Sequence, residues 1–103
     1  MKLVIIGEPS PYLDELLQRT GYADALILPV FPKPVHSPSM AQIREQREAL
    51  LKVIASQKTA TILGLGGVAL KLFLDVGSQT SVASYRGRPL TIAGTKRQAY
   101  VTY

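Results

Sequence analysis

The sequence lacks cysteine altogether and has a single histidine, His36, among its 103 residues. Without cysteine there can be no disulfide bond, no thiolate zinc site, no cysteine nucleophile and no cysteine-ligated iron–sulfur cluster. One histidine is too few for a histidine-rich metal site. We therefore expect a domain with no metal centre and no cofactor.

A long uninterrupted apolar segment is also missing. The longest apolar stretch, residues 60–74, is broken by three glycines and one lysine, whereas a membrane span needs roughly 18 or more consecutive apolar residues. Only four apolar residues follow Lys2 before Gly7, which is too few for the apolar region of a secretory signal. These absences predict a single domain over residues 1–103 that lies in the cytoplasm and does not enter a membrane.

Acidic side chains are scarce relative to basic ones. The chain has 7 Asp and Glu against 12 Lys and Arg, a formal net charge of +5. A positive excess attracts polyanions such as nucleic acid, although a charge of this size also keeps a small protein soluble. DNA is therefore an expected partner on grounds of charge.

Three apolar runs, each followed by a helical pattern, organise most of the chain. The runs at residues 3–6, 25–30 and 59–63 are typical of strands buried in a parallel sheet. Apolar residues recur at helical spacing between Leu13 and Leu17, over residues 39–57 and over residues 68–74. Ser39 and Gln42 form a capping-box pattern at the start of the second and longest helix.

Turn residues separate these elements. Residues 31–38 are rich in proline and predict an irregular loop, and residues 64–67 predict a tight glycine turn. Residues 90–93 and 99–103 predict a terminal hairpin whose turn lies at 95–98. The alternation predicts an α/β fold with a mostly parallel four-stranded sheet and helices on both faces. Functional residues are expected in the loops after Ile6, Val30 and Leu63, at the carboxyl edge of the sheet.

Two of these loops carry candidate chemistry. Glu8 follows the first strand, where a general base or a cation stabiliser would lie, or it is a solvated acid beside a helix N-terminus. Residues 64–69 fit the G-x-G-x-x-A pattern of dinucleotide-binding turns. No acidic residue follows Asp75, however, so the ribose-binding partner is missing and a packing turn is favoured.

Candidate phosphate-binding residues fall in two parts of the chain. Lys33 and His36 lie in the proline-rich loop, where His36 either contacts phosphate or is merely solvated. A second set is interleaved with tyrosines, a combination that suits phosphates and unstacked bases; it consists of Arg86, Arg88, Lys96 and Arg97. Ordinary charge at a hairpin turn explains the second set equally well.

Taken in order, these pieces resemble the superfamily of uracil-DNA glycosylases, and within it the iron–sulfur (family 4) branch. The order of the pieces over nearly the whole chain carries the resemblance. They are Ile5-Ile6-Gly7-Glu8, Asp14-Glu15-Leu16-Leu17, Pro32 and Pro38 before the helix at Ser39, Ile62-Leu63-Gly64-Leu65-Gly66, Arg86-Gly87 and Val101-Thr102-Tyr103. The resemblance implies a three-layer α/β/α glycosylase-like fold.

It also implies a base pocket, in which that family holds a flipped uracil against an aromatic ring and an amide side chain. Glu8 takes the position of the family's loop carboxylate. Tyr12 replaces the stacking aromatic, Leu26 falls where the uracil-reading asparagine is expected, and Gly64 belongs to the same pocket. The chain ends at Tyr103, where the family's His-Pro motif begins, so the domain is expected to be truncated at its C-terminus.

These departures favour a catalytically degenerate module that serves as a DNA-binding or assembly subunit, because each missing group removes a few kcal/mol of transition-state stabilisation. Its expected partners are DNA and a protein partner or a second copy. A divergent minimal N-glycosylase that excises uracil from DNA with Glu8 is the alternative. A nucleotide-binding α/β domain that uses residues 64–69 is the second alternative.

Overall fold

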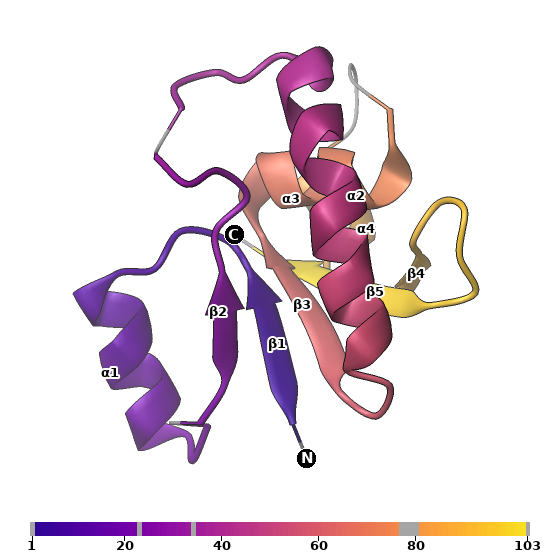
Figure 1. Ribbon diagram of the computed structural model, residues 1–103. Coiled ribbons are helices and arrows are strands. Elements are labelled where there is room, and N and C mark those ends of the chain that lie inside the picture. The colour runs from indigo at the N-terminus through magenta and orange to yellow at the C-terminus, as the bar shows by residue number, and fades with distance from the viewer. Residues whose placement is uncertain (1, 23, 34, 77–80, 103) are drawn as a thin grey trace.

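One sheet of five strands organises the fold (Figure 1). The computed structural model describes residues 2–22, 24–33, 35–76 and 81–102. The strand order is β2-β1-β3-β5-β4, and all pairs are parallel except β4 with β5. The strands are β1 (Leu3–Ile6), β2 (Leu26–Leu28), β3 (Thr61–Leu65), β4 (Leu90–Thr91) and β5 (Gln98–Thr102). The α/β class and the terminal hairpin are confirmed, whereas the expected number of four strands is corrected to five.

The helices among the described residues connect the strands and are α1 (Pro11–Arg19), α2 (Met40–Ser56), α3 (Gly66–Leu74) and α4 (Val82–Tyr85). The capping box at Ser39 and Gln42 is confirmed, since each side chain bonds to the backbone N–H of the other residue. At α1 the Ser10 hydroxyl accepts from the N–H of Leu13, and Pro11 occupies the first turn, where its missing N–H costs nothing. In the described part of the chain, no helix is long and apolar enough to cross a membrane.

The two faces of the sheet bury different amounts of apolar surface. On one face Val4, Ile6 and Ile62 pack against the apolar sides of α2 and α3, forming the larger core. On the other face Ile5 packs against Leu13 and Leu17 of α1. Figure 1 shows α1 on one side of the sheet and α2 with α3 on the other. The main core therefore lies on the α2–α3 side.

The glycine segment after the third strand differs from the expected tight turn. Gly64 and Leu65 are still part of β3, and α3 begins directly at Gly66, which adopts a positive φ of +83°. The pairing of β3 with both β1 and β5 continues to its last residues, which explains the longer strand. The Cβ position of Gly64 faces Phe73 and Ala69 in the core, so the tight turn predicted for residues 64–67 is corrected to a strand end that leads directly into α3.

Two arginines of the fold bind backbone carbonyls rather than acids. Arg97 donates to the carbonyls of Ile54, Gln57 and Ala60, at and just beyond the C-terminal end of α2. Arg47 donates to Leu72 and Phe73 at the end of α3, and to Ala93 after β4. Helix C-terminal carbonyls lack partners within the helix and favour a cation nearby. Both arginines thus fasten helix ends to neighbouring segments.

Asp75, which ends α3, should make the stability of the fold depend on pH. Its carboxylate accepts from Nε of Arg44 at 2.9 Å, and this hydrogen bond, more than the charges of Arg44 and Arg47, lowers the pKa of Asp75 below its ordinary 3.8. A carboxylate whose pKa is lower in the folded state than in the unfolded state stabilises the fold. This stabilisation is complete above the pKa of the unfolded state and is lost as the pH falls through the pKa of the folded state. We expect Asp75→Asn to lower Tm near pH 7, and this difference to disappear at an acid pH below the lowered pKa, where Asp75 is protonated. An equal difference at both pH values would contradict this; Glu45→Gln, an exposed carboxylate of α2, is the control.

Candidate functional site

The candidate site is a crevice at the carboxyl ends of β1 and β3. The chain leaves β1 for β2 on one side and later returns as β3 on the other, so the strand order reverses at this point. Ligands of open α/β sheets bind at such a point. The crevice encloses about 200 Å³ and is lined by Gly7, Glu8, Val30, Phe31, Val35 and the segment 65–69.

Glu8 is held at the crevice by the close approach of two strands. Gly7 donates its N–H to the carbonyl of Leu28 at 2.9 Å, continuing the β1–β2 pairing. A Cβ atom at Gly7 would lie 2.9 Å from the Cβ of Leu65, so a larger residue would push the two strand ends apart. The Glu8 side chain is exposed and lines the crevice. The absence of a side chain at Gly7 therefore places the carboxylate beside the end of β3.

The first turn of α3 forms the opposite wall. Leu65 at the N-cap makes no side-chain cap hydrogen bond, and Gly66 and Gly67 both line the crevice. The N–H groups of a first helical turn have no partner within the helix and carry partial positive charge. The crevice thus combines a carboxylate with hydrogen-bond donors, an arrangement that suits a neutral ligand with both donors and acceptors.

Val30, Phe31 and Val35 supply the apolar wall. Val30 and Phe31 are buried, while Val35 lies on the exposed loop that leads to α2. The sequence placed functional residues after Val30 but did not single out Phe31. The sequence does contain an indication of its role, because this aromatic residue directly follows a predicted strand at the carboxyl edge of the sheet. Phe31 offers the ring against which a planar ligand can pack.

The predicted base-pocket residues are only partly brought together. Tyr12 lies on α1, is 77% exposed and lines a second groove on the α1 side, which Glu8 also lines. Leu26 begins β2 opposite Val4 and packs on the main core, away from the carboxyl edge. Gly64 faces Phe73 and Ala69 inside the protein. Of the predicted catalytic and pocket residues, only Glu8 lines the crevice.

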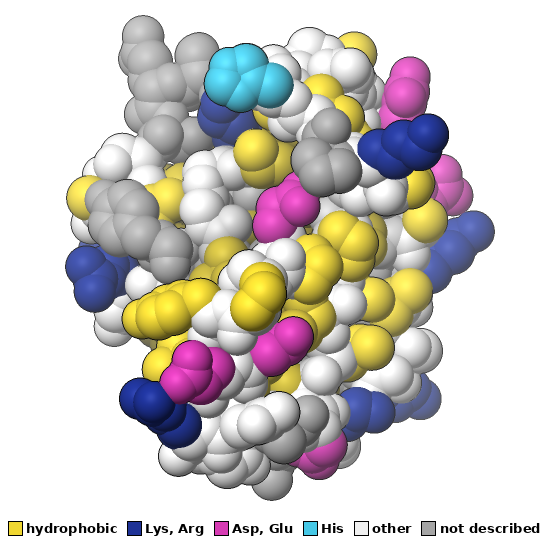
Figure 2. Space-filling view, turned by 90° about the vertical axis from the view of Figure 1, so that its left-hand side faces the viewer, with side chains coloured by type: hydrophobic (Ala, Val, Ile, Leu, Met, Phe, Trp, Pro, Cys, Tyr) yellow, Lys and Arg dark blue, Asp and Glu magenta, His cyan; other side chains and the backbone are white. Residues whose placement is uncertain are grey.

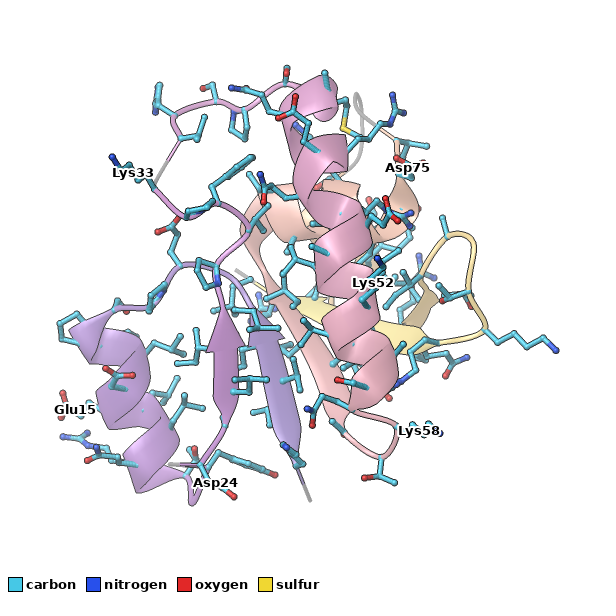
Figure 3. The ribbon with its side chains drawn as sticks, in the orientation of Figure 1. Glu15, Asp24, Lys33, Lys52, Lys58 and Asp75 are labelled. Carbon is cyan, nitrogen blue, oxygen red and sulfur yellow. The ribbon has the colours of Figure 1, made fainter. Side chains whose placement is uncertain are left out.

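The predicted DNA-binding residues lie in three separate places. Lys33 and His36 are exposed on the loop around Val35, at the crevice end of the sheet; Figure 3 labels Lys33 there, with Lys58 at the opposite end. Arg86 and Arg88 lie just before β4 in the sequence, and β4 is the strand at the outer edge of the sheet next to β5. Arg88 donates to the carbonyl of Ser84, and its guanidinium lies 5.8 Å from the ring centroid of Tyr85.

The remaining two basic residues lie in and beside the turn between β4 and β5. Lys96 is exposed in that turn. Arg97 is committed to the three carbonyls at the end of α2, which leaves its guanidinium little capacity to bind phosphate. Arg97 is thus turned toward the end of α2, whereas its neighbour Lys96 is exposed.

The described residues contain no group of three His, Asp or Glu side chains that would hold a metal ion. Comparison with protein-family models, with curated proteins and with solved structures gave no match. The function must therefore be argued from the chemistry of the crevice.

Proposed function

We propose that this chain is a glycosylase-like binding module that accepts a single unstacked base of DNA in the crevice between β1 and β3, without excising it at an enzymatic rate. The three-layer arrangement of the uracil-DNA glycosylases is part of the proposal. The parallel order β2-β1-β3-β5 with helices on both faces supports it. The observation that carries the function is the crevice itself, which pairs an aromatic wall with one carboxylate.

The size and polarity of the crevice favour a small planar ligand. Its volume of about 200 Å³ is below the roughly 300–1,000 Å³ typical of sites for drug-sized ligands. Phe31 supplies a ring, the α3 amides donate and Glu8 accepts, and these are the groups that read a base edge. A phosphate is disfavoured because it would face the Glu8 carboxylate, which argues against the nucleotide-binding alternative.

Weak catalysis is expected from the same lining. Within the described part of the chain, no residue that lines the crevice carries an amide or an imidazole side chain. Glycosidic cleavage needs a group that stabilises the leaving base as well as one that stabilises the sugar cation. Glu8 alone would serve the second purpose, so the crevice supports binding better than excision.

Binding is tested with labelled single-stranded oligonucleotides that carry uracil, thymine or an abasic analogue at one position. We expect a uracil-containing strand to bind about tenfold more tightly than the abasic strand, since occupancy of a base-stacking site contributes roughly 1–3 kcal/mol. Gly67→Leu should remove this difference, because Gly67 lines the crevice and has open space around its Cβ position. Equal affinity of the uracil and abasic strands for the unmodified protein would refute base binding.

Phosphate contacts and excision form two further arms of this experiment. Lys33→Ala should weaken all strands alike by about fivefold and reduce the salt slope by about 1. Lys58→Ala, the same change at the far end of the sheet, should have no effect. Alkali treatment after incubation should reveal no strand cleavage above that of Glu8→Gln. Excision that is lost in Glu8→Gln but kept in Glu15→Gln would instead establish the N-glycosylase alternative.

A further inference from the structure

On the α1 side of the sheet, the described residues cover β1 and β2 more fully than β3 and β5. Helix α1 packs over β1 and β2, whereas Leu63, Leu65 and Thr102 of β3 and β5 remain partly exposed beside it. Strands of parallel sheets normally have helices on both faces. Between α1 and these strands lies a groove of about 400 Å³ whose lining is mostly apolar and includes Leu3, Leu16 and Leu65.

Three exposed hydrophobic side chains among the described residues lie in or beside this groove. Tyr12 is 77% exposed, Leu16 44% and Tyr100 42%. Tyr12 and Leu16 line the groove from α1, and Tyr100 stands opposite Leu63 in the register of β5 with β3. Figure 2 shows hydrophobic side chains running across this face. Contiguous exposed apolar surface with aromatic residues marks a site of interaction.

The floor of the groove favours a helix over an extended strand as its occupant. The floor consists of side chains on the face of the sheet, whose backbone groups are already paired between the strands. An extended segment laid on it would leave its own N–H and C=O groups without partners, whereas a helix satisfies them internally. A helix beside α1 would also complete the layer on this face.

Charge indicates the composition of that helix. Of the described residues that line the groove, Glu8 alone is charged. Residues 1–30, which form α1 and its surroundings, contain four acidic and two basic residues, whereas residues 31–103 contain three acidic and ten basic ones. In Figure 2 acidic side chains lie within this face and basic ones lie mainly around its margin. The one acidic region of a basic protein therefore borders the groove.

We propose that the groove binds a cationic amphipathic helix of a partner protein, lying alongside α1 with its apolar stripe on Leu16, Leu63 and Leu65. Its N-terminus lies at the Glu8 end, where the helix dipole faces the carboxylate. The nine residues of α1 span about 14 Å at 1.5 Å per residue. The partner contributes two to three turns, with apolar anchors at positions i, i+3, i+4 and i+7.

The test uses the intact protein and three helical peptides with the same leucine stripe, whose polar positions are lysine, glutamine or glutamate. Fluorescence anisotropy should show saturable binding of the lysine peptide, at least tenfold tighter than that of the glutamate peptide at low salt. Leu16→Ser should weaken binding of the lysine peptide about tenfold, because it removes a central apolar contact. Val76→Ser is the matched control, since Val76 is 46% exposed outside the groove, and should leave binding unchanged.

Three outcomes would overturn the proposal. Absence of saturable binding of the lysine peptide would remove the docking site. Equal affinity for the lysine and glutamate peptides would refute the cationic partner. A dimer in light scattering that Leu16→Ser converts to a monomer would show that a second copy occupies the groove. Base binding in the crevice is measured separately and should be unaffected by Leu16→Ser.

Discussion

Gly64→Ala is expected to lower the free energy of unfolding by about 2–3 kcal/mol, as overpacking of a tight core does. A Cβ atom at this position would lie 2.5 Å from Cε2 of Phe73 and 2.9 Å from Cβ of Ala69, both on α3. Phe73 and Ala69 are buried, so α3 would have to move away from β3. The gain from replacing glycine, about 0.4–1 kcal/mol through the unfolded chain, is too small to compensate.

Thermal and urea denaturation would measure this effect. A loss of this size corresponds to a fall in Tm of roughly 10–20 °C in a domain of this length. Gly67→Ala is the control, because its Cβ would meet nothing within 4 Å, and it should leave Tm unchanged or slightly raised. Phe73→Leu should recover part of the loss in the Gly64→Ala background by making room. An unchanged Tm in Gly64→Ala would contradict the packing of α3 on β3.

The second large effect is expected from Arg97→Ala, which should cost about 2–4 kcal/mol of stability. The change removes charge-assisted hydrogen bonds, typically worth about 1.5–3 kcal/mol each, from the carbonyls of Ile54, Gln57 and Ala60. The site is only partly buried, so water replaces some of the lost bonds and the total falls below the sum. The C-terminal end of α2 should fray first, because it loses its connection to the hairpin.

Hydrogen exchange of the amides near the end of α2, together with urea denaturation, would test this. Arg97→Lys should recover only part of the stability, since a lysine keeps the charge but cannot reach three carbonyls with a planar fork. Lys96→Ala, a neighbouring charge change at an exposed residue, should be neutral. If Arg97→Ala had normal stability but weakened DNA binding, its role would be that of a DNA contact after all.

Local patterns predicted the parts of the fold that depend on neighbours in sequence. The helix at Met40–Ser56 followed from the capping box at Ser39, and the hairpin from the turn residues before Gln98. The extent of β3 did not follow, because Gly64 is strand only through its pairing with Ile6 and Val101. Glycine by itself favours a turn. Tertiary pairing therefore overrode the local preference of one residue.

In the candidate site, too, local sequence predicted some features, whereas others depend on tertiary contacts. The position of Glu8 at the carboxyl edge of the sheet followed from the predicted strand that precedes it. The role of Arg97 did not, because its carbonyl partners lie 37 to 43 residues earlier in the chain. A basic residue in a turn carries no local sign of whether it will meet phosphate or a helix end. Nor does sequence alone show that Tyr12 meets Glu8 in the groove beside α1 and not in the crevice, since that depends on how α1 lies on the sheet.

The lateral margins of the sheet have a consequence for behaviour at high concentration. The outermost strands are β2, with three residues, and β4, with two. Pro29 directly follows β2 and has no N–H to offer an incoming chain. Strands this short make poor templates for polymerisation into fibrils. Copies of this molecule should therefore resist amyloid-like growth even when crowded.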